Sequence, residues 1–443
     1  MSNNQIDLLI KNATIVTMNP ALEIHQPGAL AIKGDTITAV GPEKELSPLE
    51  STAREILDAQ GGAVLPGLIN THTHAAMTLF RGLADDLPLK TWLEEIIFPA
   101  ESRFVNPDSV YWGSLLACAE MILSGTTTCA DGYFCMDGSV KAMDESGMRG
   151  VLGQGVVDFP APGIPDPTAN ISEALRFVEK WGGFSSRIEP GIFCHSPYTC
   201  SPDTIRTVKE ICRGEQVLFF IHAAETLEEV SLIKSRYGKT PIRHLDNLRI
   251  LDPQTVIAHA IYVDSEEIEL LAQTRTAVAH CPESNMKLAS GIAPVVEMLN
   301  KGVLVGLGTD GCASNNDLDL LKEMDTAAKL GKVRYLDPTV MDARTVLRMA
   351  TIEGARVLGL EKEIGSIEIG KKADIIFLDL NRPHLIPCYD PFSLMVYSAQ
   401  GSDVHSVMIE GRMVMENRKI LTFDIDEVMD QVIRISRGII SGE

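Results

Sequence analysis

Eight short apolar runs, separated by segments with helical signals, constrain the fold of this chain more than any other feature. The first run ends at His74, and the others follow at 126–134, 150–159, 188–195, 217–222, 255–259, 277–280 and 303–310. Helix starts fall between them: Ser201-Pro202 joins an N-cap residue to proline, and Asp264 with Glu267 forms a capping-box pattern. Eight βα units in about 250–300 residues predict a (β/α)8 barrel, the TIM barrel.

The segments on either side of these units have a different pattern. Residues 1–64 alternate short β-rich runs with turn residues, and β-rich runs return at 373–380 and 404–414. We expect the two flanks to pair into a small β-sandwich domain built from both termini. The predicted α/β organisation is a first β-sandwich part at 1–64, a distorted TIM barrel at 65–364, and a second β-sandwich part plus a C-terminal helix at 365–443.

Charge and cysteine usage narrow the class of protein. The 60 acidic residues outnumber the 39 basic ones, for a net charge of −21, and such a surface repels nucleic acid. The 9 cysteines include no Cys-x-x-Cys pair, which is typical of reduced thiols rather than a disulfide framework. No apolar run approaches the ~18 residues of a membrane span. We therefore predict a cytoplasmic protein with no nucleic-acid or membrane partner, and a homo-oligomer is compatible with the sequence.

The first apolar run ends in His72-Thr73-His74. Residues two apart on a strand share a face and lie roughly 6.6 Å apart, so two such imidazoles can bind one metal ion. The alternative interpretation is a polar strand end that is hydrogen-bonded to backbone.

Several other strand candidates also end in side chains suited to metal binding or proton transfer. These residues are His195, His222, His259, His280 and Asp310. Because the C-terminal strand ends of a TIM barrel form its active-site face, we expect a metal site there. Three histidines and one aspartate leave a coordination position for water, which is typical of a catalytic metal site.

Glu225 follows His222 by three residues, just beyond the fifth strand candidate. A carboxylate beside a metal site can serve as a proton shuttle, whereas in isolation it could simply be an acid at a helix N-terminus. The end of the fourth strand candidate, residues 193–197, contains no lysine that could bridge two metals after carboxylation. We therefore predict a single metal ion.

Six segments carry a resemblance to a known family. They are PGLINTHTHAAMTLFRGLADDLPLKTWLEE (66–95), CHSPYTCS (194–201), IHAAET (221–226), HCPESNMKLASG (280–291), GLGTDGCASNN (306–316) and GSIEIGKKADIIFLDL (365–380). As a set they resemble the amidohydrolase superfamily, and within it the deaminases of 5′-methylthioadenosine and S-adenosylhomocysteine. The resemblance implies hydrolytic deamination of an adenine nucleoside, adenosine included, to the inosyl product and ammonia.

The same resemblance implies roles for individual residues. It implies a zinc ion, with iron as the alternative, bound by His72, His74, His222 and Asp310. Glu225 would shuttle protons, and His259 would orient the attacking hydroxide. In the mechanism that we expect, Asp310 helps His259 to orient it. For the nucleoside, the resemblance implies Trp92 and Glu101 in the loop after strand one, with Glu101 accepting hydrogen bonds from the ribose, and His195 reaching the same substrate.

One position departs from the family pattern. Related deaminases often carry an arginine on strand three that suits a substrate carboxylate, whereas this chain has Gln154, with no Lys or Arg from 150 to 175. The departure predicts that 5′-methylthioadenosine or adenosine is used at least as efficiently as S-adenosylhomocysteine. A cation from elsewhere would reverse this preference, and Arg103 and Arg187 are candidates.

Two further classes of function remain as alternatives. One is a related hydrolase that acts on another aminated heterocycle, such as guanine, cytosine or an s-triazine. The other is a non-catalytic barrel that serves as an assembly protein, and the complete set of metal-type residues argues against it.

Overall fold

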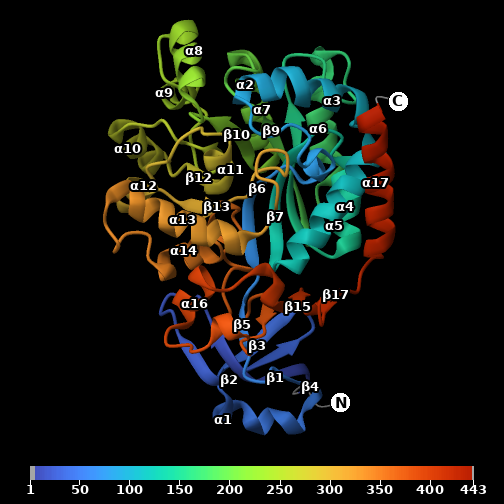
Figure 1. The fold of residues 1–443 in the computed structure, drawn as a ribbon, viewed down its shortest axis with the longest axis vertical. Helices are drawn as coiled ribbons and strands as arrows, with labels where there is room; N and C mark the ends of the chain where they lie inside the picture. The colour runs from blue at the N-terminus through green and yellow to red at the C-terminus, as the bar shows by residue number, and fades with distance from the viewer. Residues whose placement is uncertain (1–4, 442–443) are drawn as a thin grey trace.

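The computed structural model describes residues 5–441, so residues 1–4 and 442–443 of the predicted terminal segments lie outside the described residues. It contains a parallel sheet of eight strands and a separate sheet of nine. Figure 1 shows the eight-stranded sheet in the upper part of the molecule and the nine-stranded sheet below it, where the blue N-terminal strands and the red C-terminal strands lie together. The predicted α/β architecture is confirmed.

The eight parallel strands are neighbours in sequence order. They are β6 (Leu68–Thr73), β7 (Thr126–Tyr133), β8 (Arg149–Val156), β9 (Ile188–Cys194), β10 (Phe219–Ala223), β11 (Thr255–His259), β12 (Ala277–His280) and β13 (Val305–Leu307). Side chains join the two edge strands β6 and β13: Thr71 Oγ1 donates to the Leu307 carbonyl at 2.8 Å, and Asn70 Nδ2 donates to Thr309 Oγ1 at 2.7 Å. The sheet is thus a nearly closed barrel.

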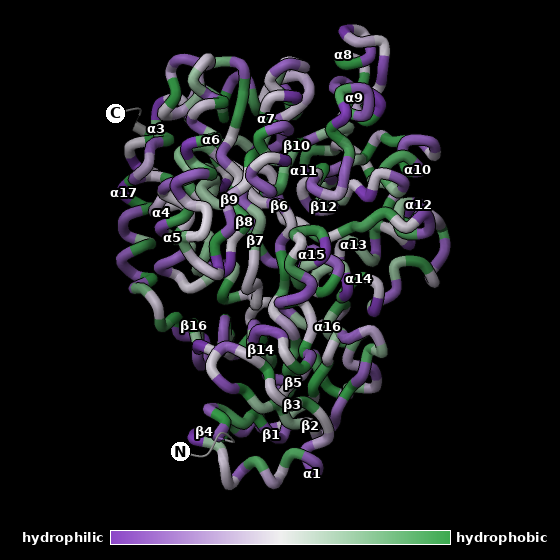
Figure 2. The backbone as a smooth tube through the Cα atoms, turned by 180° about the vertical axis from the view of Figure 1, so that it is seen from behind, coloured by the Kyte–Doolittle hydropathy of each residue, from purple (hydrophilic) through white to green (hydrophobic). Residues whose placement is uncertain are grey.

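Helices surround the barrel. The longer ones are α4 (Pro107–Leu123), α5 (Asp137–Ser146), α6 (Asn170–Trp181), α7 (Pro202–Glu215), α8 (Leu227–Tyr237), α10 (Ser265–Thr274) and α13 (Leu320–Tyr335). Both predicted caps are present: Ser201 Oγ accepts from Thr204 N at 3.2 Å, and Asp264 and Glu267 form the capping box of α10. Figure 2 shows hydrophobic and hydrophilic residues alternating along these helices, as expected when one face packs on the barrel.

Shorter helices complete the barrel and its surroundings. They are α1 (Glu43–Leu46), α2 (Leu89–Thr91), α3 (Phe98–Phe104), α9 (Pro241–Asn247), α11 (Pro282–Lys287), α12 (Val295–Asn300), α14 (Ala343–Met349), α15 (Ile352–Val357) and α16 (Pro391–Tyr397). None of the described helices has the length and apolar character needed to cross a membrane.

The nine-stranded sheet combines the two ends of the chain. Its strands are β1 (Ile6–Val16), β2 (Ile24–Lys33), β3 (Thr36–Pro42), β4 (Ala53–Asp58), β5 (Ala63–Pro66), β14 (Ile375–Leu378), β15 (Val404–Ile409), β16 (Arg412–Glu416) and β17 (Lys419–Ile420). N-terminal β5 pairs with C-terminal β14, which joins the two flanks as predicted. Most pairs are antiparallel, but β1 runs parallel to both β4 and β5. The boundaries predicted at 64/65 and 364/365 stay a prediction.

The apolar run that leads to His74 is two strands rather than one. Strand β5 belongs to the terminal sheet and β6 to the barrel, with Gly67 between them. A Cβ at Gly67 would lie 2.1 Å from Thr127 Oγ1, so the crossing requires glycine. The chain therefore changes sheets immediately before the segment that carries His72 and His74.

A buried ion pair connects the base of the barrel to the terminal sheet. Arg149, the first residue of β8, lies with its Nε 3.0 Å from Asp374 Oδ2, and both side chains are 2% exposed. Asp374 also accepts from the backbone N–H of Glu410 at 2.8 Å. The C-terminal helix α17 (Ile425–Ser441) runs instead along the barrel side, where Val428 packs with Leu115 of α4 and Ala142 of α5 (Figure 1).

We predict that Arg149→Met lowers the free energy of unfolding by about 3–5 kcal/mol, because it leaves the Asp374 carboxylate buried without its partner. The matched control is Arg54→Met, since Arg54 pairs with Asp7 at 3.0 Å but is 65% exposed. Its loss should cost about 0–1 kcal/mol. Urea unfolding followed by circular dichroism measures both, and equal destabilisation by the two variants would contradict a structural role for the buried pair.

Candidate active site

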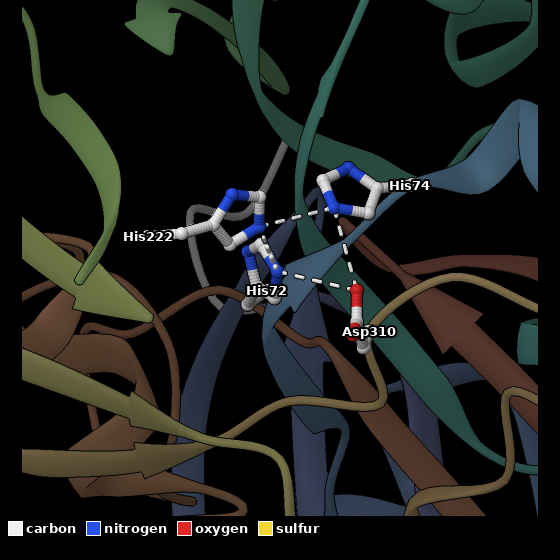
Figure 3. Close-up of side chains that lie close together, drawn as sticks. All are labelled: His72, His74, His222 and Asp310. Atoms are coloured by element: carbon white, nitrogen blue, oxygen red, sulfur yellow. Dashed lines mark hydrogen bonds and ion pairs between the residues drawn. The ribbon is translucent and has the colours of Figure 1, made fainter. Parts of the chain in front are cut away.

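Four side chains converge at the C-terminal mouth of the barrel. Two come from the end of β6, His72 and His74, one from β10, His222, and one from the turn after β13, Asp310. Each offers one ligand atom, and all four atoms lie within 4.8 Å of one another. Figure 3 shows the three imidazoles and the carboxylate directed at a common point.

The spacing of these atoms is suited to a shared metal ion. His222 Nε2 lies 3.3 Å from both His72 Nε2 and His74 Nε2. Asp310 Oδ1 lies 3.4 Å from His72 Nε2 and 3.3 Å from His74 Nε2. A tetrahedron with metal–ligand distances of ~2.0–2.1 Å has edges of ~3.3–3.4 Å. Four of the six spacings between the ligand atoms have this length, and all six are within 4.8 Å, so the donor set of three histidines and one carboxylate suits a zinc-type ion in a distorted arrangement.

Backbone carbonyls orient two of the imidazoles. His222 Nδ1 donates to the carbonyl of His195 at 2.8 Å, and His74 Nδ1 donates to the carbonyl of Gly132. Donation from Nδ1 places the proton there and leaves Nε2 as the free lone pair, which is the form that binds metal. Phe193 on β9 packs against the rings of both residues, with ring centroids 4.9 and 5.7 Å apart.

Burial sets the protonation state of the metal-type residues. It lowers the pKa of His72 to about 4 and that of His222 well below its usual value. Burial alone would raise the pKa of Asp310, but the hydrogen bond from His72 and the nearby histidines bring it well below its ordinary value. Neutral imidazoles and an ionised carboxylate are the forms that ligate metal.

Glu225 and His259 lie beside the four ligand atoms. His259 Nε2 is 3.9 Å from Glu225 Oε2. Burial raises the pKa of Glu225, whereas the pKa of His259 is raised because Glu225 and Asp310 outweigh the opposing effect of its burial. Both His259 and Asp310 have left-handed backbones, with φ of 73° and 60°, a conformation that non-glycine residues rarely adopt and that is often found at functional sites.

One short segment after β12 supports three of these groups. From α11 and the loop behind it, Ser284 Oγ donates to Asp310 Oδ2 at 2.7 Å, and Ser290 Oγ donates to Glu225 Oε1 at 3.3 Å. Asn285 Oδ1 accepts from His259 Nδ1 at 2.9 Å. Sequence reasoning assigned no role to these residues, although they lie in the segment HCPESNMKLASG that carries the family resemblance.

The predicted substrate-binding residues line a cavity over the four ligand atoms. Trp92 and Glu101 reach it from the segment after β6, and His195 from the end of β9. Burial raises the pKa of Glu101 to about 7, and the hydroxyl of Tyr133, missed by sequence reasoning, donates to Glu101 Oε1 at 2.6 Å. His195 Nδ1 lies 3.0 Å from Thr199 Oγ1, so its Nε2 is left for a ligand.

Other residues singled out from the sequence lie elsewhere. His280 ends β12, but its side chain lies among Val295, Ala327 and Tyr335, outside the barrel. Gln154 lines no part of the cavity over the metal-type residues, because its side chain is buried and its Oε1 accepts from the backbone N–H of Met136.

The two candidate cations also line no part of the cavity. Arg187 precedes β9 at the base of the barrel, where it forms ion pairs with Asp144 at 2.7 Å and Glu410 at 3.7 Å. Arg103 lines a different hollow, beside Asn106 of the α3–α4 connection and Arg434 of α17.

Comparison with known proteins places this architecture in a family. The model of the amidohydrolase family matches residues 63–414. A 5-methylthioadenosine/S-adenosylhomocysteine deaminase of Syntrophobacter fumaroxidans is 48% identical over 99% of this chain and 100% of its own length. A 5′-deoxyadenosine deaminase of Methanosarcina acetivorans is 45% identical over 96% of both chains.

A solved structure shows the same fold over the full length. The crystal structure of an adenosine deaminase from Xanthomonas campestris with bound zinc superposes with a TM-score of 0.95, at 34% identity and 99% coverage of both chains. On the family match and these identities, the chain belongs to the amidohydrolase family.

Proposed function

We propose that this protein is a zinc-dependent hydrolase that deaminates adenine nucleosides to the inosyl product and ammonia. The observation that carries the proposal is the set of four ligand atoms within 4.8 Å of one another, with Glu225 and His259 beside them. The named activities of the relatives from Syntrophobacter and Methanosarcina support an adenine nucleoside as substrate, and the zinc bound to the Xanthomonas structure supports the metal.

His72, His74, His222 and Asp310 would hold the metal ion. When bound, such an ion acts as a Lewis acid and lowers the pKa of water to about 7. Glu225 accepts the proton of the attacking water and delivers it to the ring nitrogen beside the amino-bearing carbon. His259, held by Asn285, donates a hydrogen bond that orients the attacking oxygen, and Asp310 acts on the same oxygen as an acceptor. The hydroxyl proton of the resulting tetrahedral adduct then passes through Asp310 to the amino group, which leaves as ammonia while the ring carbon becomes a carbonyl.

The residues around the cavity would hold the nucleoside. Glu101 accepts hydrogen bonds from the ribose hydroxyls, Trp92 covers the substrate, and His195 Nε2 binds a ring atom. The cavity encloses about 80 Å³ in this structure, less than the ~300–1,000 Å³ typical of ligand pockets. The segment 89–104 forms one wall, and its outward displacement would enlarge the cavity for a nucleoside.

Removal of a metal-type residue tests the ligand set. We expect His222→Ala and Asp310→Asn to lose stoichiometric zinc, measured by elemental analysis, and to lose activity with it. Removal of a residue that only orients a metal ligand typically weakens metal binding roughly 10- to 100-fold. Removal of a ligand itself should weaken metal binding by more. The control is His405→Asn, a histidine on the terminal sheet, which should retain both. A His222 variant with full zinc and normal turnover would remove His222 from the ligand set.

Glu225→Gln separates proton transfer from metal binding. The amide is nearly isosteric, so zinc content should match the wild type, but it cannot carry a proton. General acid–base catalysis contributes typically ~10²–10⁴-fold, and two transfers through one group place the expected loss of kcat at the upper end. Glu210→Gln, on the exposed side of α7, serves as control. Turnover within tenfold of the wild type would mean that another group moves the proton.

Glu101→Gln tests recognition of the ribose. A hydrogen bond to a charged group contributes about 1.5–3 kcal/mol, so kcat/KM for adenosine should fall by roughly 10- to 150-fold. The same variant should change kcat/KM for 2′,3′-dideoxyadenosine little, because that substrate lacks both hydroxyls. Equal losses on the two substrates would show that Glu101 shapes the cavity without binding the ribose.

A further inference from the structure

The backbone immediately before Glu225 is held in a conformation that its sequence does not favour. Ala224 joins the end of β10 to Glu225 and has a φ of 57°, in the left-handed region. Alanine rarely adopts that region, because its Cβ lies too close to the following carbonyl oxygen. A strained residue of this kind persists only where its surroundings fix it, so other groups must hold Ala224 and Glu225 in place.

The carboxylate of Glu229 holds this backbone. Its Oε1 accepts a hydrogen bond from Ala224 N at 3.0 Å, and its Oε2 accepts one from Glu225 N at 2.8 Å. The Glu229 side chain is buried, and each of its oxygens binds one of two consecutive N–H groups. Because Glu229 lies in the first turn of α8, a single side chain joins this helix to the backbone of the proton shuttle.

These hydrogen bonds differ from those of an ordinary helix cap. In a capping box, the acid at the third helical position accepts from the N–H of the N-cap residue, as Glu267 of α10 does from Asp264 N at 2.9 Å. The N-cap residue of α8 is Thr226, whose hydroxyl accepts from Glu229 N at 3.1 Å. The Glu229 side chain reaches past the N-cap residue to the two residues before it. Its carboxylate therefore holds the active-site loop rather than the helix end.

Burial makes the two hydrogen bonds important for Glu229 itself. Across residues 5–441, Glu229 forms no ion pair. A buried carboxylate without a cation is unfavourable unless hydrogen bonds satisfy its oxygens. The buried carboxylate and the loop conformation therefore stabilise each other.

A second set of hydrogen bonds completes the support of Glu225. The carbonyl of Ala224 accepts from Tyr262 N at 2.9 Å, and the Tyr262 hydroxyl donates to the carbonyl of Ser290 at 2.6 Å. Ser290 Oγ in turn donates to Glu225 Oε1 at 3.3 Å. Glu225 is thus fixed at its backbone by Glu229 and at its carboxylate by Ser290.

We propose that Glu229 is a positioning residue: by holding the N–H groups of Ala224 and Glu225, it keeps the Glu225 carboxylate where proton transfer requires it. The inference rests on the proposed function, because Glu229 acts through the proton shuttle. The two hydrogen bonds of its carboxylate go to the loop backbone and not to the metal-type residues. Removal of Glu229 should therefore impair proton transfer and leave metal binding and substrate affinity intact.

The first test measures Glu229→Ala and Glu229→Gln, both zinc-loaded, with adenosine as substrate. Glu229→Ala removes both hydrogen bonds, and kcat should fall on the order of 100-fold, as for a displacement of about 1 Å at a reacting group. Glu229→Gln keeps one acceptor oxygen and should lie between Glu229→Ala and the wild type. KM should stay within about threefold, because the lost interaction matters in the transition state, and zinc content should match the wild type.

The matched control is Glu267→Ala, which removes the buried carboxylate at the corresponding position of α10. Glu229→Ala and Glu267→Ala should both lower the temperature of thermal unfolding, but only Glu229→Ala should lower kcat. If the alanine variant does not fold, the nearly isosteric Glu229→Gln carries the test.

A double mutant shows whether Glu229 acts through Glu225. If it does, adding Glu229→Ala to Glu225→Gln should change kcat by no more than about twofold, because the proton shuttle is already lost. Independent roles would instead multiply, and the double mutant would lose a further factor on the order of 100. Ammonia release over long incubations at high enzyme concentration measures these low rates.

Each outcome has a defined meaning. A loss of kcat with unchanged KM and zinc, absent from Glu267→Ala and from the Glu225→Gln background, supports the assignment. Loss of zinc, kcat within about threefold of the wild type in the folded Glu229 variants, or multiplicative effects in the double mutant would overturn it. Failure of the proposed function looks different: the zinc-loaded wild type releases no ammonia from adenosine, or Glu225→Gln keeps turnover within about tenfold.

Discussion

Convergence of four ligand atoms on one point is the constraint on which the rest of this structure depends. His72 and His222 are 150 residues apart in the chain, yet their Nε2 atoms lie 3.3 Å from each other. Two imidazole lone pairs and a carboxylate at such spacing repel one another or compete for protons unless a cation lies between them. The barrel holds them there because its strands end at a common rim, and the side chains that join β6 to β13 bring Asp310 beside His72 and His74.

The groups that orient the site come from few elements. Carbonyls at the ends of β7 and β9 fix the tautomers of His74 and His222, and the α11 segment contacts Asp310, His259 and Glu225 in turn. Precise positioning of this kind matters because catalytic geometry tolerates small displacements poorly. Asp310 and the proton-transfer groups are thereby tied to one segment, while residues of 89–104 form another wall of the cavity.

The metal site and the surface around the cavity are built from different parts of the fold. Metal-type residues lie on strand ends, whose positions the barrel determines, whereas a second hollow beside the cavity is lined by α8 and the connections around it. Loops and helices at a barrel mouth can change without disturbing the barrel.

Local patterns in the sequence were sufficient to predict the barrel, the pairing of the two terminal flanks and the residues at the strand ends. They were sufficient because alternating apolar runs, caps and metal-type side chains are encoded within a few residues of each other. Only the tertiary structure showed that the run before His74 is divided between two sheets at Gly67. It also showed that the His280 side chain lies outside the active site. The supporting roles of three polar residues became visible only there as well: Ser284, Asn285 and Ser290. These features depend on the direction of a side chain and on partners that are distant in the sequence. Local periodicity determines neither the direction nor the partners.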